Sequence, residues 1–245
     1  MEVSPDFACT AMCLSNLGLQ NILHSHISIW NRAMYVDKVS VVKMTEEEML
    51  FYAKFTDLVL NCEYDYANYL NGTIPGTSYS AYGVLVKRTA VCQGYALAYK
   101  YLCNQVGIDC YMVTSTAMNH AWNMIVLGEN LYQVDVTWDD PAWDRIGGVS
   151  HSYMFLSDEQ LTARKHHDWE VTIGSDVVDL TATDTTYDNY FWGNASSQLV
   201  RDGGDYYYTD GNTMKLTKYT AADQSTAAVA DLVYGLCRGV LDFRL

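Results

Sequence analysis

The spacing of apolar side chains changes along the chain, and each spacing predicts a different kind of element. Between residues 45 and 66 apolar positions recur every three or four residues, at Met49, Phe55, Leu58, Val59 and Cys62. This period predicts a helix, and Thr45 followed by Glu48 is a capping-box pair for its start. The stretch 71–80, "NGTIPGTSYS", contains Asn-Gly and Pro-Gly pairs, which indicate a loop.

A second helical pattern begins at Cys92 and ends near Val106, and a period of two follows it. The helix would have one apolar face, formed by Tyr95, Tyr99, Leu102, Cys103 and Val106. Gly107 then suits the end of a helix. The next three segments alternate as strands do, at 108–116, 120–127 and 131–138. A tight turn at Gly128-Glu129 would join the last two strands, so the pattern predicts an α+β fold with an antiparallel sheet.

After residue 150 the sequence predicts shorter elements than in the preceding part of the chain. We expect a strand at 152–156, "SYMFL", and a short helix that begins at Ser157. From about residue 185 short aromatic segments alternate with Asp-Gly and Gly-Asn turns, as in "NYFWGN", "DYYYTDGNTMKLTKY" and "DLVYGL". We therefore divide the chain into an N-terminal region without a readable pattern, 1–44, a core, 45–185, and a small β-rich appendage, 186–245.

Composition and charge exclude several kinds of partner. The chain has 245 residues, of which 49% are hydrophobic and 18% charged, so it can bury a core. Its 15 basic and 29 acidic residues give a net charge of −14, which argues against nucleic acid and against anionic membrane surfaces. The mildly apolar stretch 8–19 is too short for a membrane span and lacks the basic start of a signal peptide.

One of the seven cysteines stands apart from the others. The sequence has no Cys-x-x-Cys pair, so a zinc ribbon or finger is not expected. Cys62 and Cys103 lie on apolar helical stripes and Cys110 lies in a strand, which favours a role in the core for all three. Cys92 instead occupies the predicted first turn of its helix, where free N–H groups and the helix dipole favour a thiolate. Cys92 is therefore the candidate nucleophile.

A thiol nucleophile needs a base and a group that orients the base. If Gly128 and Glu129 form the turn, His120 faces Thr137 across the hairpin. Asp135 is two positions away and projects from the same face, within reach of His120. An acidic residue between two valines is costly to bury without a partner. His120 and Asp135 could therefore be base and orienter, or a hydrogen-bonded pair with no catalytic role.

Two longer stretches, "VCQGYALAYKYLCNQVGIDC" and "NHAWNMIVLGENLYQVDVTWDDP", resemble the transglutaminase-like superfamily, a branch of the papain-like cysteine enzymes. In that family a Cys opens a helix, His-Ala-Trp opens a strand, and Asp-x-Thr-Trp closes the next strand. The residues that match these motifs, in order, are Cys92, His120 and Asp135, with the aromatics Trp122 and Trp138. The matching block runs from about Tyr79 to Pro141, and the expected helix at 45–66 and the segment 151–170 fit the bacterial-type members more loosely. The resemblance implies a papain-like core with the nucleophile helix packed on an antiparallel sheet.

The resemblance also implies acyl-transfer chemistry through a thioester. Cys92 would attack a peptide or amide carbonyl, His120 would take the thiol proton and pass one to the leaving amine, and Asp135 would hold the imidazole. The Cys92 N–H would be one donor of the oxyanion hole. Related enzymes often add an upstream Gln, but residues 73–91 contain none, so we expect Tyr82 to serve. We also expect Trp122 to contact substrate.

Three outcomes for the chain stay open at this point. We expect hydrolysis of a peptide or amide bond, because a crosslinking enzyme must shield its thioester from water and this chain has little with which to build a tunnel. The alternatives are a crosslinking transglutaminase and a non-catalytic module that binds peptide or glycan. The resemblance suggests a cell-wall or surface-associated substrate, in an extracellular or envelope setting, and no cofactor. The four histidines outside the triad that invite a metal reading, at 24, 26, 166 and 167, lack further ligands at suitable spacing, which favours a structural or solvated role.

Overall fold

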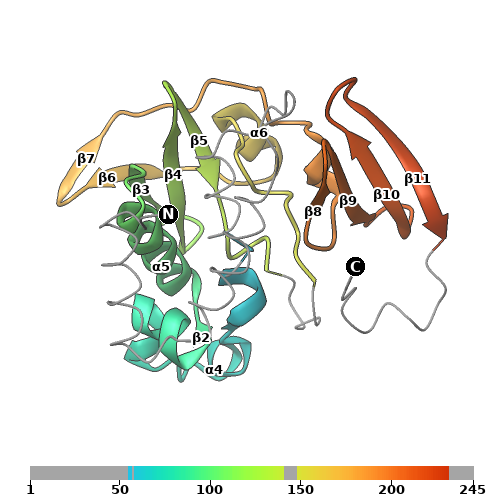
Figure 1. The fold of residues 1–245 in the computed structure, drawn as a ribbon. Helices are drawn as coiled ribbons and strands as arrows, with labels where there is room; N and C mark the ends of the chain where they lie inside the picture. Colours follow the sequence, from blue (N-terminus) through green and yellow to red (C-terminus); the bar gives the residue numbers. More distant parts are fainter. Residues whose placement is uncertain (1–54, 57, 141–147, 232–245) are drawn as a thin grey trace, which may run out of the picture.

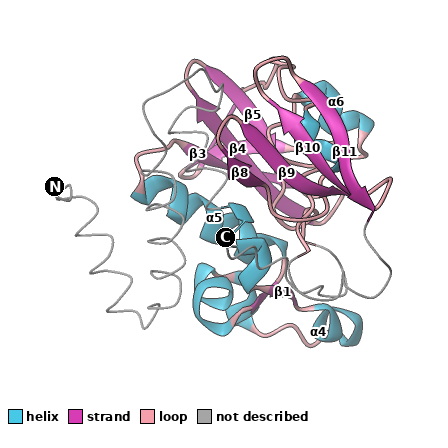
Figure 2. Cartoon of the chain, turned by 45° about the vertical axis from the view of Figure 1, so that its right-hand side comes forward, coloured by secondary structure: helices cyan, strands magenta, loops and turns pink. Residues whose placement is uncertain are grey.

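The fold is seen in a computed structural model, which describes residues 55–231 except 57 and 141–147. Two antiparallel sheets lie side by side, and helices cover the larger one (Figures 1 and 2). The predicted α+β class is confirmed. The region 1–44 and the capping box at Thr45 and Glu48 lie outside the described residues. Among the described helices none is both long and apolar enough to cross a membrane.

The first predicted helix ends earlier than its pattern suggests. Described residues between 55 and 61 are helical, and the chain then enters β1 (Glu63–Tyr64). This short strand pairs in parallel with β2 (Thr89–Ala90), and backbone hydrogen bonds from Glu63 and Asp65 tie the two segments together. A second helix, α4 (Tyr66–Asn71), follows. The apolar stripe ends at Cys62, so its period carries no information about the residues that form β1.

The segment between α4 and β2 is more ordered than the predicted loop. It holds the 3-10 helix η1 (Gly76–Tyr79) and the π-helical turn η2 (Gly83–Lys87). Asp65 fixes this segment, because its two carboxylate oxygens accept hydrogen bonds from the side chains of Asn68 and Ser78. These contacts set the backbone that leads into the nucleophile helix.

Helix α5 (Cys92–Gln105) confirms the predicted second helix. Its buried face includes Tyr95, Tyr99, Leu102 and Cys103, as the apolar stripe requires. Gly107 follows with a φ of +78°, a left-handed conformation that glycine adopts without strain. The helix lies against the sheet that comes next in the chain (Figure 1).

The larger sheet has the strand order β5-β4-β3-β6-β7 and is antiparallel throughout. Its strands are β3 (Cys110–Ser115), β4 (His120–Leu127), β5 (Asn130–Val134), β6 (Glu170–Ile173) and β7 (Asp176–Val178). Leu127 pairs with Asn130 and Asn123 with Val134, which confirms the predicted hairpin register. The strand expected to reach residue 138 stops at Val134, and residues 136–139 form a turn.

The segment after this turn differs from its prediction in one element. Residues 152–156 do not form a strand; they make turns and one isolated bridge, between Leu156 and Gln133. The helix expected after Ser157 is present as α6 (Asp158–Ala163), and the Ser157 side chain accepts the N–H of Gln160. The β6–β7 hairpin had no predicted counterpart.

The second sheet has the order β11-β10-β9-β8. Its strands are β8 (Val200–Asp202), β9 (Asp205–Asp210), β10 (Lys215–Thr220) and β11 (Ser225–Asp231), with β9 and β10 forming the expected hairpin. The segment "NYFWGN" was predicted as a strand but contains the 3-10 helix η3 (Phe191–Asn194), whose Trp192 is buried. Most of "DLVYGL" lies outside the described residues.

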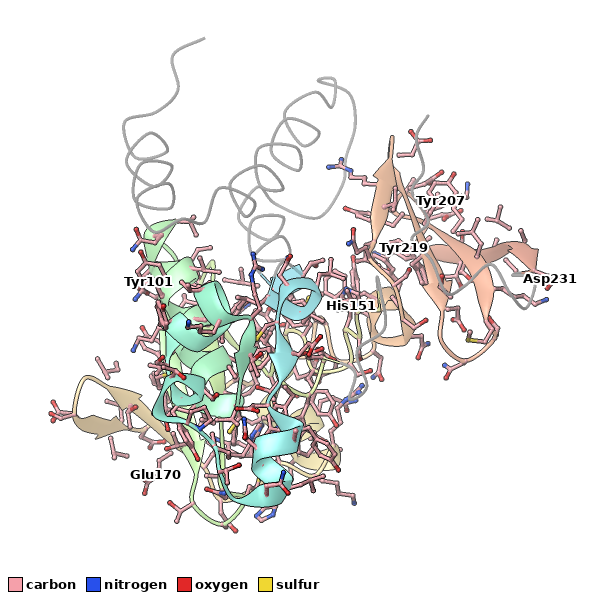
Figure 3. All side chains as sticks on the ribbon, turned by 90° about the horizontal axis from the view of Figure 1, so that it is seen from below. Tyr101, His151, Glu170, Tyr207, Tyr219 and Asp231 are labelled. Carbon is pink, nitrogen blue, oxygen red and sulfur yellow. The ribbon has the colours of Figure 1, made fainter. Side chains whose placement is uncertain are left out.

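A single buried cluster joins the second sheet to the rest of the fold. It contains Tyr99 of α5, Ile125 of β4, Trp192 of η3 and Tyr219 of β10. His151 lies at the junction (Figure 3), where its Nδ1 is 3.3 Å from the carbonyl oxygen of Ala195. A smaller cluster, with Trp122 and Met124, covers the other face of the larger sheet. This sheet is therefore buried on both faces near the site.

Candidate active site

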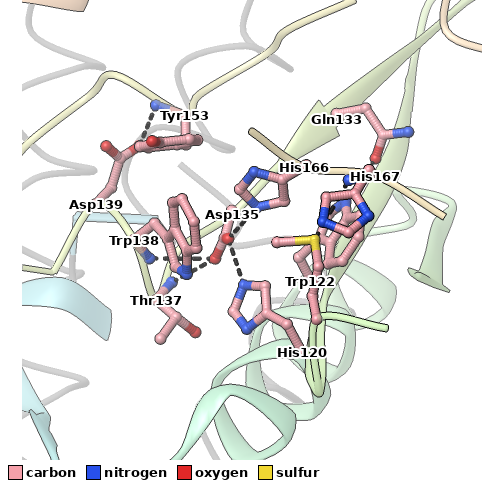
Figure 4. Close-up of polar contacts among 11 residues, drawn as sticks. His120, Trp122, Gln133, Asp135, Thr137, Trp138, Asp139, Tyr153, His166 and His167 are labelled. Carbon is pink, nitrogen blue, oxygen red and sulfur yellow. Dashed lines mark hydrogen bonds and ion pairs between the residues drawn. The ribbon is translucent and has the colours of Figure 1, made fainter. Parts of the chain in front are cut away.

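The end of β5 brings an acidic side chain to the first residue of β4. The ladder of hydrogen bonds between the two strands stops at Val134, and the N–H of Asp135 donates instead to the carbonyl of Tyr153 (3.0 Å). The Asp135 side chain thereby reaches His120, and its Oδ2 lies 2.6 Å from Nε2 (Figure 4). The predicted pair thus meets, although Asp135 stands just beyond the strand in which it was expected.

The second oxygen of Asp135 builds the turn that follows it. Oδ1 accepts the backbone N–H groups of Thr137 (3.0 Å) and Trp138 (3.2 Å). An Asx turn of this kind competes with a strand for the same backbone groups. This competition explains why the predicted strand ends before Asp135.

A second histidine binds the same carboxylate. His166 follows α6, is fully buried, and places Nε2 2.8 Å from Asp135 Oδ2. Sequence reasoning gave it only a structural or solvated role, because its contact with a residue far away in the chain leaves no trace in local spacing. The one available signal was chemical, since a buried carboxylate calls for more donors than a single histidine supplies.

Cys92 is the first residue of α5 and is partly exposed. Because His120 uses Nε2 for Asp135, Nδ1 is the ring nitrogen left for the thiol. Burial acts to lower the pKa of His120, but the charge and hydrogen bond of Asp135, together with a hydrogen bond to Cys92, raise it from 6.5 to about 10. The three residues predicted as a triad therefore come together from α5, β4 and the end of β5.

The carboxylate is held in its ionised form. Burial acts to raise the pKa of Asp135, but the charge and hydrogen bond of His120, followed by the hydrogen bond and charge of His166, lower it from 3.8 to about 2. At neutral pH an ionised Asp135 thus faces a histidine that favours its protonated form. This arrangement suits a thiolate–imidazolium pair.

Aromatic rings enclose both histidines. The ring centroids of Trp122 and Trp138 each lie 5.5 Å from that of His120. Trp122 is only 1% exposed and donates its indole N–H to Gln133 Oε1 at 2.9 Å. Its burial argues against the predicted contact with substrate. Trp138 is 41% exposed and is the tryptophan that faces solvent beside His120.

Two tyrosines are candidate donors for an oxyanion hole. Tyr82, the predicted donor, is 49% exposed, and the Lys87 ammonium lies 5.8 Å from its ring centroid. Tyr64 pairs with Ala90 of β2 and so lies beside the start of α5. Burial first, and then the nearby Cys92, raise the pKa of Tyr64 to about 12. Sequence reasoning missed Tyr64, because its position depends on the parallel pairing of two very short strands.

The described residues contain one group of side chains that could approach a metal ion together, formed by His120, Asp135 and His166. Their ligand atoms lie within 4.8 Å of one another. However, the separations of 2.6 and 2.8 Å to Asp135 Oδ2 are hydrogen-bond lengths. Ligands placed about 2 Å from a zinc ion in a tetrahedron stand roughly 3.3 Å apart. The spacing of these three side chains therefore fits hydrogen bonds between them better than coordination of a metal ion.

Residues 37–138 match the family model of the transglutaminase-like superfamily. This part of the chain belongs to that superfamily, whose members are typically cysteine-dependent enzymes. The match confirms the resemblance read from the motifs around Cys92, His120 and Asp135.

Several kinds of solved structure match parts of this chain. A TGase matches with 17% identity and a TM-score of 0.37, over 56% of this chain and 34% of that chain. A candidate cysteine protease from Cytophaga hutchinsonii matches with 17% identity and a TM-score of 0.31, over 67% and 56%. The arylamine N-acetyltransferase NAT3 from Bacillus cereus matches with 12% identity and a TM-score of 0.32, over 79% and 89%. The chain thus spans about a third of the TGase and just over half of the protease candidate. A comparison with curated proteins gave no match.

Proposed function

We propose that this chain is a cysteine-dependent acyl-transfer enzyme that hydrolyses a peptide or amide bond. The observation that carries the proposal is the convergence of Cys92, His120 and Asp135 at the start of α5. A nucleophile, a base with a raised pKa and an ionised orienter are the three groups that acyl transfer needs. A binding module would gain nothing from a partly exposed thiol beside such a base.

The reaction would run in two halves. The thiol proton of Cys92 passes to His120, and the thiolate attacks the carbonyl carbon to give a tetrahedral adduct with a negative oxygen. As the adduct collapses, the C–N bond breaks and His120 gives its proton to the leaving nitrogen, which leaves a thioester on Cys92. His120 then deprotonates a water molecule that attacks the thioester, the C–S bond breaks, and the acid product leaves as the thiol is restored.

The negative oxygen of the adduct needs hydrogen-bond donors. The backbone N–H of Cys92 has no partner within its own helix, because it belongs to the first turn. We assign the second donor to the hydroxyl of Tyr64, in place of the predicted Tyr82. The support for this assignment is the position of Tyr64 opposite Ala90, two residues before the nucleophile.

Hydrolysis and transfer to an amine can be separated in one assay. The protein is incubated with a peptide library and a labelled primary amine at millimolar concentration, with Cys92→Ala as the control. We expect free acid to exceed labelled amide, and both to disappear in the control. Predominant labelled amide would identify a crosslinking enzyme with the same triad. Equal product from the wild type and the control would overturn the enzymatic proposal.

A further inference from the structure

We propose that His166 is a positioning residue of this site: it holds Asp135 ionised and in place, and so sets how firmly Asp135 stabilises the protonated His120. The inference rests on the proposed function and adds a fourth side chain to the triad. His166 would not touch the substrate, and it would act entirely through Asp135.

The hydrogen bonds of Asp135 are the basis of this inference. An ionised carboxylate has about four lone-pair positions, and Asp135 fills four. Oδ1 accepts two backbone N–H groups, and Oδ2 accepts the Nε2–H groups of His120 and His166. Among the described contacts, His166 is thus the one side chain besides His120 that donates to this carboxylate. His166 therefore supplies one of the two hydrogen bonds that Oδ2 accepts, and His120 supplies the other.

The surroundings of His166 fix both its direction and its tautomer. Its ring centroid lies 4.4 Å from that of Trp138, 4.8 Å from Trp122 and 5.4 Å from Tyr153, so three aromatic rings confine it (Figure 4). Its Nδ1 is buried without a hydrogen-bond partner among the described residues. Nε2, by contrast, lies 2.8 Å from Asp135 Oδ2. The geometry therefore places a proton on Nε2, the ring nitrogen that can donate to Asp135.

The groups around His166 leave Asp135 as its hydrogen-bond acceptor. The titratable groups that face His166 are His120, Asp135 and Tyr153. Arg164 lies against the Tyr153 ring, 5.7 Å from its centroid, and Asp139 accepts the Tyr153 N–H. His166 thus favours the ionised form of Asp135 through a hydrogen bond, and Asp135 in that form stabilises the protonated His120.

The test removes the donor and then restores it. His166→Leu keeps an apolar side chain in the aromatic cage but leaves Oδ2 with one donor. His166→Gln offers an amide N–H at about the reach of Nε2. The measured quantity is the rate of Cys92 alkylation by iodoacetamide, followed by peptide mapping, at pH 6 and at pH 9.5. At pH 6 the thiolate depends on its pairing with His120, and at pH 9.5 that dependence is small.

We expect the ratio of the pH 6 rate to the pH 9.5 rate to fall roughly tenfold in His166→Leu, the size of one hydrogen bond to a charged group. In His166→Gln this ratio should return most of the way to the wild-type value. A purely structural role would lower the melting temperature without changing this ratio, so a folded His166→Leu protein with the wild-type ratio would overturn the inference. A wild-type ratio like that of an ordinary cysteine would instead remove the proposed function, and the positioning role with it.

A second measurement keeps the inference testable if His166→Leu does not fold. Nitrogen NMR of 15N-histidine-labelled wild-type protein reports the tautomer of each ring directly. We expect His166 to carry a proton on Nε2 at pH 7. A ring without a proton on Nε2 would contradict the arrangement on which the positioning role depends.

Discussion

At the scale of single residues, the candidate site combines residues that the sequence pattern predicts with residues that only the structure brings to it. Cys92, His120 and Asp135 could be predicted because each has a local sign: a helix start, a strand start and an acid between valines. His166 and Tyr64 could not, because each reaches the site through tertiary pairing alone. Trp122 matched a motif, but a motif does not tell which of two nearby tryptophans is buried.

Asp135→Asn is expected to lower turnover by a few orders of magnitude, as in other hydrolytic triads whose orienting carboxylate becomes an amide. The amide has no charge for His120, and its NH2 group must face donors on whichever side it lies. Asp184→Asn is the matched control, because Asp184 is also a hydrogen-bonded carboxylate but binds Tyr132 and Asn130. Turnover on the best library peptide checks this, and equal losses in both variants would contradict the orienting role.

Replacing each candidate oxyanion donor, Tyr64 or Tyr82, by Phe removes only its hydroxyl group and so tests that group alone. Tyr64→Phe is expected to lower kcat by about 100-fold with little change in KM, because the hydroxyl would act mainly on the charge of the transition state. Tyr82→Phe should have little effect, since Tyr82 is half exposed. If the two variants exchange these effects, Tyr82 is the donor, as first predicted from the sequence.

At the scale of elements, the period of the apolar residues predicted most helices and strands of the core. It failed where a side chain binds backbone N–H groups that a strand would otherwise use. Helices α5 and α6 and the β4–β5 hairpin follow their patterns closely. The last part of the 131–138 strand was lost to the turn that Asp135 builds. The expected strand at 152–156 is held by a single bridge. No local pattern shows whether an extended segment will find a complete partner strand.

Gly94 provides a test of how closely α5 must approach η1. A Cβ at this position would lie 2.5 Å from the carbonyl oxygen of Ser78 and 2.9 Å from the Ala90 Cβ. Alanine usually stabilises a helix relative to glycine, but here we expect Gly94→Ala to cost about 1–3 kcal/mol and to slow Cys92 alkylation. Urea denaturation measures the first effect and peptide mapping the second.

Gly193→Ala is the control for this substitution. Nothing lies within 4 Å of the Cβ that it would add, and the backbone there is not left-handed. We expect its unfolding free energy to stay within about 0.5 kcal/mol of the wild type. A stabilised Gly94→Ala protein would show that α5 and η1 can separate without harm to the site.

At the scale of the whole molecule, the second sheet contributes to the stability of the fold, because it shares a buried core with the larger sheet. Its tyrosines share a buried cluster with α5 and β4, although the strands themselves form a separate sheet. The composition shift near residue 185 predicted a distinct β unit, and β9 and β10 are where the alternation placed them. The sharing of a core could not be predicted, because aromatic residues suit an exposed sheet and a buried one equally.

The pH dependence of the molecule's stability should be governed in part by Asp139. Burial first raises the pKa of this carboxyl from 3.8 to about 8, and the charge of Asp135 adds to the shift. The folded state therefore keeps a proton that the unfolded state has released, so stability falls as pH rises from about 4 to about 8. Asp139→Asn cannot ionise and should lose less stability over this range.

The size of this difference should be on the order of 3 kcal/mol between pH 5.5 and pH 8. Urea unfolding at both values, for both proteins, measures it. His120 changes stability in the same direction: its folded pKa is raised to about 10, so its contribution is fully present below pH 6.5 and is lost between about pH 6.5 and 10. Both proteins share this loss, so the difference between them reports Asp139. Parallel pH dependences for Asp139→Asn and the wild type would show that Asp139 ionises without cost.

The order of the site residues along the chain has a consequence for biosynthesis. Cys92 leaves the ribosome first, His120 and Asp135 follow, and His166 comes last. At roughly 5–20 residues per second, several seconds separate the thiol from its final partner. During that interval the cysteine would have neither base nor ionised carboxylate to activate it. Reactivity would thus arise only after the sheet that carries it has formed, which limits unwanted acylation of the nascent chain.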